Sequence, residues 1–584
     1  MFLPTSIKEV RALGWEYIDV ILFTGDAYID HPAFGAAVIG RSLEAAGYRV
    51  AIVPQPNWRD DLRDFKKLGA PRLFFGVTAG AMDSTVMHYT PTRRLRSNDA
   101  YTPGGKHGAR PDYPTIVYTQ ILRELYPDSL ILLGGIEASM RRFTHYDYLQ
   151  ERLRPSFLVE SGADLILYGM GEVGIVDFAR KVESGREWCN LNQIVYLSEE
   201  KSTDNAIILN SYEECLKNKE KFAENFLEIE KQSNRMEAER LVEPTKGKYV
   251  VVNPPYPTFT TKECDATYAL PYERQPAPRY RGKVIPAWDM IKNSVMLHRG
   301  CYGGCSFCAI SMHQGKYIAS RSEESVLAEI KQITQSAEFR GTISDVGGPS
   351  ANMWKSSGID QTKCKKCSRP SCLYPKPCAN LKTYHQDILK LYAKIEKIEG
   401  VKHIYVGSGI RYDMPQVWDG YMQRVIEKHT SGRLKVAPEH TEEHILKLMR
   451  KPKWEEFLAT KTRFDRVCRD KGLPYIIIPY FISSHPGCTK EDMQLLATKT
   501  KGVRTEDVQD FTPTPLTMST TMYYCGCNPS TQEKLFVAKE KSQKEVQKSY
   551  FFDKNQSKKG NFVHNKNDYN KQWQKKKATQ NVKK

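Results

Sequence analysis

The sequence predicts an α/β protein with an N-terminal doubly wound parallel sheet, followed by a full or partial β/α barrel and a basic tail. Three observations predict this fold class. Strand-like apolar runs alternate with helical patterns over residues 1–180. Seven prolines then fall within residues 254–286, a composition typical of extended loops. Strand–helix alternation resumes from residue 288 to about residue 529.

These changes of pattern divide the chain into four predicted parts. Residues 1–250 form the sheet domain, 251–287 a proline-rich linker, 288–530 the barrel, and 531–584 a tail that we expect to be disordered. A cysteine-rich insertion over residues 355–380 interrupts the barrel.

The first domain shows strand patterns that end in glycine-rich turns, such as Gly134-Gly135 and Gly169-Met170-Gly171. In an open parallel sheet, turns at the carboxyl ends of the strands form the crevice that binds ligands. No dinucleotide-binding fingerprint is predicted for the domain. The predicted strands are 19–24, 48–53, 73–77, 130–133 and 164–168, with helices over 35–47 and 212–240.

The second domain repeats strand and helix patterns over about 240 residues. Five or six such β/α units indicate a full or partial barrel, in which chemistry is built on the loops that follow the strands. The predicted strands are 294–297, 342–346, 403–406, 434–437 and 475–480.

The charge is basic but unevenly distributed. Lys and Arg number 86 and Asp and Glu 68, which gives a net charge of +18. Residues 551–584 hold ten Lys and two Asp, so this tail alone supplies +8. The remaining excess is typical of a solvated surface. RNA binding through the basic surface or the tail is the alternative.

No membrane segment or secretion signal is predicted. The longest apolar runs, such as Tyr475–Ile482, span about eight residues, against roughly 20 for a membrane-spanning helix. A proline and charged residues occupy the N-terminus, where a signal peptide would hold an apolar core. We therefore expect a cytoplasmic protein without membrane contact.

The cysteines are concentrated in one region. Seven of the 14 fall between Cys301 and Cys378, whereas the first 188 residues contain none. In a cytoplasmic protein, cysteines at short spacings indicate metal or cluster ligation rather than disulfides.

The most informative motif is Cys301-x3-Cys305-x2-Cys308, which follows a predicted barrel strand. Gly303 and Gly304 allow the loop to curl tightly, so that three thiols can converge. A [4Fe–4S] cluster has four irons, and three thiolates leave one iron open to another ligand. An open position indicates a catalytic site rather than a structural one. A zinc site or three buried thiols is the alternative.

This spacing, with Phe307 just before the third cysteine, resembles the signature of the radical SAM superfamily. In that superfamily the open iron binds S-adenosylmethionine, and one-electron reduction cleaves it to methionine and a 5′-deoxyadenosyl radical. The resemblance implies that Phe307 lies against the adenine. It implies further cofactor contacts by Gly347, Gly348 and Pro349 at the methionine end, by Ser408 and Arg411 in a later turn, and by Glu439 in a segment similar to that of radical SAM methylthiotransferases.

Nearly the whole chain is similar to the YgiQ family of radical SAM proteins, over about residues 1–530. This resemblance implies one [4Fe–4S] cluster, S-adenosylmethionine and a separate N-terminal domain, and it implies no substrate. The segments that carry it are 13–22, 25–32, 134–142, 344–349 and 510–515.

The N-terminal domain also resembles the cobalamin-binding domains that precede many radical SAM barrels. Their DxHxxG pattern is not met, because Asp30 and His31 are adjacent and the next glycine is Gly35. We therefore expect no cobalamin, with a His-independent mode of binding as the alternative.

A second group of thiols, Cys364, Cys367, Cys372 and Cys378, has the spacing C-x2-C-x4-C-x5-C among lysines and prolines. Four thiols this close indicate a metal site. Structural zinc and an auxiliary Fe–S cluster both fit the spacing, and free thiols are the third alternative.

The predicted function is a radical SAM enzyme whose substrate and catalytic residues the sequence leaves unidentified. A reductant such as flavodoxin or ferredoxin is the expected partner. Two alternatives stay open: an RNA-modifying radical SAM enzyme, and a non-catalytic Fe–S or metal-binding protein.

Overall fold

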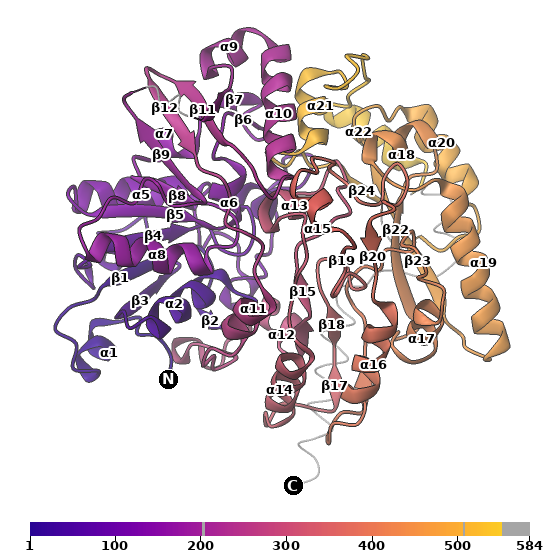
Figure 1. Cartoon of the computed structure of the whole chain (residues 1–584), viewed down its shortest axis with the longest axis horizontal. Coiled ribbons are helices and arrows are strands. Elements are labelled where there is room, and N and C mark those ends of the chain that lie inside the picture. The colour runs from indigo at the N-terminus through magenta and orange to yellow at the C-terminus, as the bar shows by residue number, and fades with distance from the viewer. Residues whose placement is uncertain (201–204, 506–507, 552–584) are drawn as a thin grey trace.

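The computed structural model describes residues 1–200, 205–505 and 508–551. Two α/β units lie side by side, the N-terminal unit in indigo to magenta and the second in red to orange (Figure 1). No helix within the described ranges has both the length and the apolar content needed to cross a membrane.

The N-terminal unit is organised by one nine-stranded sheet of order β10-β11-β12-β9-β8-β5-β4-β1-β3. The five strands from β3 to β8 are parallel, which confirms the predicted parallel sheet. They are β1 (Val20–Thr24), β3 (Val50–Pro54), β4 (Phe74–Thr78), β5 (Leu130–Gly134) and β8 (Leu165–Leu167).

Helices cover both faces of this sheet, so it is doubly wound as predicted. Alternate residues of β1 enter separate cores: Val20 and Leu22 pack with helices α2 (Gly35–Ala45) and α8 (Glu172–Glu183). Ile21 and Phe23 pack on the opposite face, with α5 (Pro114–Leu125). The period of two along each strand explains why the buried strands read as continuous apolar runs.

Four further strands extend the sheet and were not predicted. β9 and β12 join it antiparallel, and β11 and β12 form a hairpin whose turn residues Lys246 and Gly247 both have positive φ. A two-residue turn of this kind usually carries Asn, Asp or Gly at its first position and Gly at its second. Here Lys246 holds the first position, so the sequence does not signal the hairpin. The strands are β9 (Ile194–Ser198), β10 (Ala206–Ile208), β11 (Arg240–Thr245) and β12 (Lys248–Val252).

Strand β11 buries a carboxyl group, which makes stability depend on pH. Burial raises the pKa of Glu243 to about 8, although the backbone N–H of Thr144 donates a 2.8 Å hydrogen bond to Oε2. Between about pH 4.5 and pH 8 the folded chain therefore holds a proton that the unfolded chain releases, and stability falls by up to about 1.4 kcal/mol per pH unit.

We expect Glu243→Gln to raise the thermal unfolding midpoint at about pH 8.5 and to leave it nearly unchanged at about pH 5, because glutamine keeps the acceptor and never ionises. Thermal unfolding of both proteins across this pH range measures the difference. An equal difference at both pH values would contradict a protonated Glu243.

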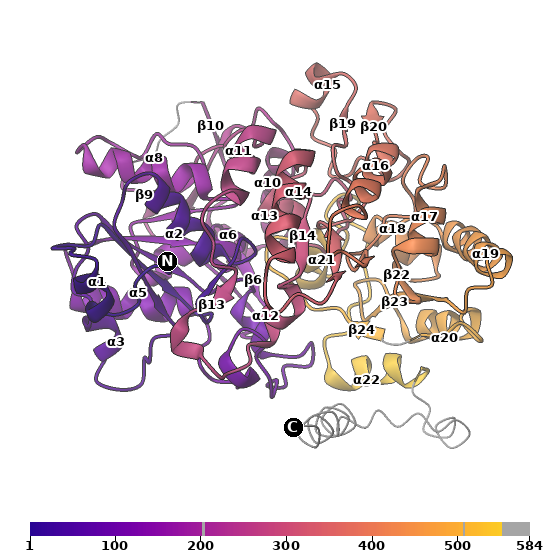
Figure 2. The same ribbon diagram turned by 90° about the horizontal axis from the view of Figure 1, so that it is seen from below.

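The second unit is a partial β/α barrel. Its parallel strands hydrogen-bond in three groups, β14 with β18, β17 with β21, and β22 with β23 and β24. Helices surround them (Figures 1 and 2). The strands are β14 (Ser294–Met296), β17 (Thr342–Ile343), β18 (Asp345–Gly347), β21 (His403–Ile404), β22 (Arg433–Glu439), β23 (Ile476–Ser483) and β24 (Val508–Asp510), and the main helices are α14 (Glu323–Thr334), α16 (His385–Ile395), α17 (Tyr421–Lys428), α19 (Trp454–Asp470) and α20 (Lys490–Lys499).

The segment 251–287, predicted as a linker, carries structure of its own. It contains α11 (Thr261–Tyr268), and β13 (Gln275–Pro276) pairs with β2 (Ile29–Asp30) of the first unit. The backbone N–H of Ala277 also donates to Tyr28 O at 3.0 Å. The segment therefore packs against the N-terminal unit before α12 (Pro286–Ile291) leads into the barrel.

The prediction that disorder begins at residue 531 is wrong as far as residue 551. Helix α22 (Lys541–Ser549) packs on the barrel through Gln547, whose amide exchanges hydrogen bonds of 2.7 Å with Ser484 N and Cys488 O. The sequence pattern missed this helix because its anchor is a buried amide rather than an apolar stripe. The rest of the predicted tail, 552–584, lies outside the described residues.

Candidate active site

The first three motif cysteines lie on one closed loop at the end of the first barrel strand. The loop joins β15 (His298–Arg299) to α13 (Ile310–Gln314). Cys301 N donates to Gly315 O at 3.1 Å, and Cys308 N donates to Cys305 O at 3.1 Å. These bonds hold the three thiols on a short arc of chain, as the spacing predicts.

Two glycines are required for this arc. Gly304 has φ +60°, and a Cβ built on it would lie 2.1 Å from Pro370 O. A Cβ on Gly303 would lie 2.8 Å from Arg411 Nη1 and 3.3 Å from Cys301 Sγ. The loop thus leaves no room for a side chain between the thiols and their neighbours.

Arg411 faces the middle thiol. Its Nη1 lies 3.2 Å from Cys305 Sγ, while Nε and Nη2 bind the two oxygens of Asp413 at 2.8 and 2.5 Å. Asn352 fixes the backbone of Arg411 with bonds of 2.9 and 3.0 Å. The resemblance implied that Arg411 contacts S-adenosylmethionine, and in this structure its guanidinium contacts a cysteine sulfur. Asp413 and Asn352 were not predicted.

The outer two thiols are partly buried. Burial raises the pKa of Cys301, and it raises the pKa of Cys308 to about 12, with Cys305 and Cys301 adding to the rise. Cys301 Sγ also lies 3.8 Å from Ser350 Oγ. Thiols in such surroundings ionise when a cation such as iron binds them.

This donor set fits a cluster better than a single ion. Among the described residues, no three His, Cys, Asp or Glu side chains are grouped so that they could hold one metal ion. A [4Fe–4S] cluster offers a separate iron to each thiolate, so the sulfurs need not converge on one atom. Three cysteines on one glycine-shaped loop suit that arrangement.

The turn after β18 lies beside the turn after β21. Asp345 Oδ1 accepts hydrogen bonds from the backbone N–H groups of Gly407 and Ser408 at 2.8 and 3.1 Å, and Ser408 Oγ donates to Oδ2. A Cβ on Gly347 would lie 2.5 Å from Ser408 Oγ. The structure therefore joins Gly347 and Ser408, two of the predicted cofactor-binding residues.

His298 is a candidate ligand-binding residue that the sequence analysis missed. A Cβ on Gly348 would lie 2.5 Å from its ring, and Pro349 follows in the same turn. The ring is buried, neither nitrogen has a hydrogen-bond partner among the described residues, and burial lowers its pKa to about 3. A neutral imidazole with two unused nitrogens at this turn could accept or donate one bond to a bound molecule. Its position three residues before Cys301 was the available signal.

The remaining two predicted residues are Glu439, on a later strand, and Phe307, on the cysteine loop itself. Glu439, at the end of β22, has φ +72° and lies 3.8 Å from Lys451 Nζ; burial raises its pKa. Phe307 packs edge-on against His485 with ring centroids 6.4 Å apart. A contact between Phe307 and adenine stays a prediction.

The cysteine-rich insertion packs directly on the loop of the first three cysteines. Ser371 Oγ donates to Gly303 O at 2.8 Å, and Cys372 N donates to Tyr302 O at 3.0 Å. Buried Lys316 reaches into it, with Nζ 3.5 Å from Cys367 Sγ. The other two thiols are nearby: Asn380 Nδ2 lies 3.4 Å from Cys364 Sγ, and Cys378 N donates to Cys372 O at 2.8 Å.

Comparisons with known proteins match nearly the full chain. The family described as Radical SAM N-terminal matches residues 2–294, and a family described as a domain of unknown function (DUF3362) matches residues 506–559. The UPF0313 protein of Porphyromonas gingivalis is 54% identical over 570 residues, 94% of this chain and 90% of the relative. That of Bacteroides thetaiotaomicron is 52% identical over 580 residues, 94% of each chain.

Among solved structures, one match is the radical S-adenosylmethionine methyltransferase TsrM from Kitasatospora setae, with tryptophan substrate and a SAM analogue bound. The TM-score is 0.47 and the sequence identity 13%, over 85% of this chain and 75% of that chain. A second structure of that protein, with cobalamin and a [4Fe–4S] cluster bound, matches with a TM-score of 0.47 and 14% identity, over 84% and 72%.

Proposed function

The chain belongs to the UPF0313 family and carries a radical SAM N-terminal domain, and from this premise we propose that it binds one [4Fe–4S] cluster and reductively cleaves S-adenosylmethionine. The observation that carries the proposal is the loop of Cys301, Cys305 and Cys308 at the carboxyl end of the first barrel strand, with Arg411 against the middle sulfur. Active sites of β/α barrels are built at this end of the strands.

In this proposal the three thiolates hold the cluster. When bound, a [4Fe–4S] cluster supplies the electron that splits S-adenosylmethionine into methionine and a 5′-deoxyadenosyl radical. Arg411 offsets the negative charge of the thiolates, and Asp413 holds Arg411 in place. The partial burial of the loop limits the access of water, which would quench a reactive intermediate.

The turns after β18 and β21 bind and orient S-adenosylmethionine in this proposal. Gly347 and Gly348 leave the backbone open to a ligand, and Asp345 keeps the Ser408 turn beside them. Pro349 has no side-chain acceptor, so backbone carbonyls of this turn would receive the methionine amino group.

We also propose that Cys364, Cys367, Cys372 and Cys378 hold a second metal, as zinc or as an auxiliary Fe–S cluster. Its support is the sequence spacing of the four thiols, the contact of Lys316 Nζ with Cys367 Sγ at 3.5 Å, and the packing of the insertion on the loop of the first three cysteines. The four thiols are not grouped around one point in the described residues, so a single zinc ion would require them to move together. Metal analysis separates the two forms, because zinc is redox-inert and a second cluster adds iron and sulfide.

The test is anaerobic reconstitution with iron and sulfide, then reduction by dithionite with S-adenosylmethionine present. We expect 5′-deoxyadenosine from the wild type, measured by mass spectrometry, and at least about a hundredfold less from Cys305→Ala, which lacks a cluster ligand. Cys468→Ala, a buried cysteine of α19 far from the loop in sequence, is the matched control.

An intact cluster with no product, both alone and with reduced flavodoxin or ferredoxin as electron donor, would contradict the enzyme and favour the binding-protein alternative. Equal product from wild type and Cys305→Ala would contradict the assigned cluster site.

A further inference from the structure

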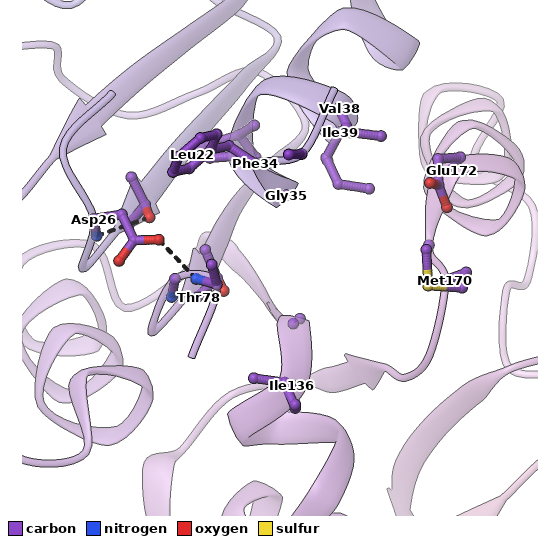
Figure 3. Close-up of a pocket in the computed structure, with 18 of the residues that line it drawn as sticks. Leu22, Asp26, Phe34, Gly35, Val38, Ile39, Thr78, Ile136, Met170 and Glu172 are labelled. Carbon is purple, nitrogen blue, oxygen red and sulfur yellow. Dashed lines mark hydrogen bonds between the residues drawn. The ribbon is translucent and has the colours of Figure 1, made fainter. Parts of the chain in front are cut away.

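A cavity that none of the three motif cysteines lines lies between the two units. It measures about 300 Å³, within the range for small-molecule ligands. Its walls are the carboxyl ends of β1, β4 and β5 and the starts of α2 and α8 (Figure 3). Residues of the second unit, among them Arg299, His313 and Gln314, close it.

The cavity lies at a topological switch point of the sheet. β1 pairs in parallel with β3 on one side and with β4 on the other. The chain leaves β1 toward α2 and β3, then crosses to β4, so the turns after β1 and β4 diverge. In open α/β sheets ligands bind in the crevice outside such strand ends.

The start of α2 suits a phosphate. The helix begins Gly35-Ala36-Ala37, its N-cap Phe34 makes no side-chain cap, and its first turn has no acidic residue. Within the described part of the chain, no group accepts a hydrogen bond from the N–H of these three residues. Three free N–H groups at the positive end of an 11-residue helix match the oxygens of a phosphate.

The turn from β8 into α8 brings a glycine motif to the same cavity. Residues 169–174 read Gly-Met-Gly-Glu-Val-Gly, which is the GxGxxG spacing, so the prediction that no such fingerprint occurs is wrong. Gly169 has φ +72°, and a Cβ on Gly174 would lie 2.8 Å from Leu167 Cδ1. The first glycine thus makes the tight turn, and the last lets helix and strand pack closely.

The phosphate does not belong at α8, however. The second variable position of the motif is Glu172, so a carboxylate already occupies the first turn of α8, and β9 runs antiparallel to β8 rather than parallel. Glu172 Oε1 pairs with Arg299, while Oε2 has no partner among the described residues although the side chain is 6% exposed. This buried acceptor requires a donor, such as a ribose hydroxyl.

The other carboxylate of the cavity, Asp26, belongs to a buried ion-pair cluster in which Arg110 also pairs with Asp99. Asp26 is paired with Arg110 at 2.7 Å, and Oδ2 accepts from Ala81 N at 2.7 Å (Figure 3). Between the two polar ends the wall is aliphatic, and Leu22, Ile39 and Ile136 are among its residues. An apolar ring or sugar face fits against such a wall.

We propose that this cavity binds a nucleoside monophosphate, with the phosphate at the start of α2, the base or sugar face against the aliphatic wall, and a ribose hydroxyl on Glu172. The ligand would touch the base of the thiol loop, because Gln314 Oε1 accepts from Gly300 N at 3.1 Å. The inference is independent of the proposed reaction, since it needs neither cluster nor S-adenosylmethionine.

The test is calorimetric titration of the full chain, purified without a cluster, with the 5′-monophosphates of adenosine, guanosine, cytidine and uridine. We expect at least one to bind about tenfold or more tightly than its nucleoside or inorganic phosphate, because both ends of the site are then used. Ala36→Asp should weaken that binding at least about tenfold by placing a carboxylate on the phosphate site.

Ala36→Asn is the matched control, with the same shape and no charge, and it should bind within about threefold of wild type. Both variants should fold, since Asp and Asn are tolerated in the first turn of a helix and Ala36 is only partly buried. Equal binding by the two variants overturns the proposal, and so does a panel in which no monophosphate exceeds inorganic phosphate.

Discussion

Replacing Gly304 with alanine is expected to remove the cluster, leaving less than about a tenth of the wild-type iron and of the 5′-deoxyadenosine formed. Two costs combine at this position. A non-glycine residue at φ +60° is strained, and the new Cβ would lie 2.1 Å from Pro370 O, a backbone atom that cannot rotate away. The loop must therefore change shape, and the three thiols move apart.

The measurement is iron and sulfide per chain after reconstitution, with the thermal unfolding midpoint of the cluster-free chain as a check on folding. Gly409→Ala is the matched control: it lies in a neighbouring barrel loop, its Cβ would meet nothing within 4 Å, and its φ is not positive. Gly304→Ala should lose the cluster while the unfolding midpoint of the apo chain changes little. Full iron in Gly304→Ala would show that the loop adapts and that its described shape is not required.

The parallel strands could be predicted because each is a short apolar run whose two sides both enter a core. Val20 and Ile21 are adjacent in sequence yet belong to opposite faces, and both are fully buried. The cysteine loop could also be predicted, since ligand spacing is local and its glycines lie between the ligands. In both cases the physical cause lies within about ten residues of chain.

The rest of the site depends on contacts between distant residues, which no local pattern records. Arg411 lies 106 positions after Cys305, and its contact with the sulfur follows from the order of the barrel strands. Ser371 and Gly303 likewise meet across 68 positions. Sequence spacing gave two separate cysteine groups, and only packing shows that the second one supports the loop of the first.

The GxGxxG spacing at residues 169–174 does not mark the proposed phosphate site, for a different reason. Its glycines have the spacing and the backbone roles of a phosphate turn, but Glu172 neutralises the helix start that such a turn normally offers. The unmarked start of α2, Gly35-Ala36-Ala37, has the free N–H groups instead. A motif indicates a phosphate site only where charge and hydrogen bonding agree with its geometry.

Substitutions of the two members of the Arg411–Asp413 pair are expected to shift the reduction potential of the cluster in opposite directions. Arg411→Gln removes a positive charge 3.2 Å from Cys305 Sγ, which favours the oxidised cluster and lowers its reduction potential by on the order of 100 mV. Asp413→Asn leaves Arg411 uncompensated and should raise the potential. Burial alone would raise the pKa of Asp413, but Arg411 outweighs it, so this carboxyl is ionised in the folded chain.

Potentiometric titration followed by electron paramagnetic resonance measures both shifts, and iron content shows whether each variant keeps its cluster. A lower potential requires a stronger reductant, so Arg411→Gln should form 5′-deoxyadenosine more slowly at a fixed dithionite potential, and Asp413→Asn should not. Arg411→Lys, which keeps the charge but loses the fork to Asp413, should shift the potential less than Arg411→Gln. Shifts of the same sign in Arg411→Gln and Asp413→Asn would mean that the pair acts on the shape of the loop rather than on its charge.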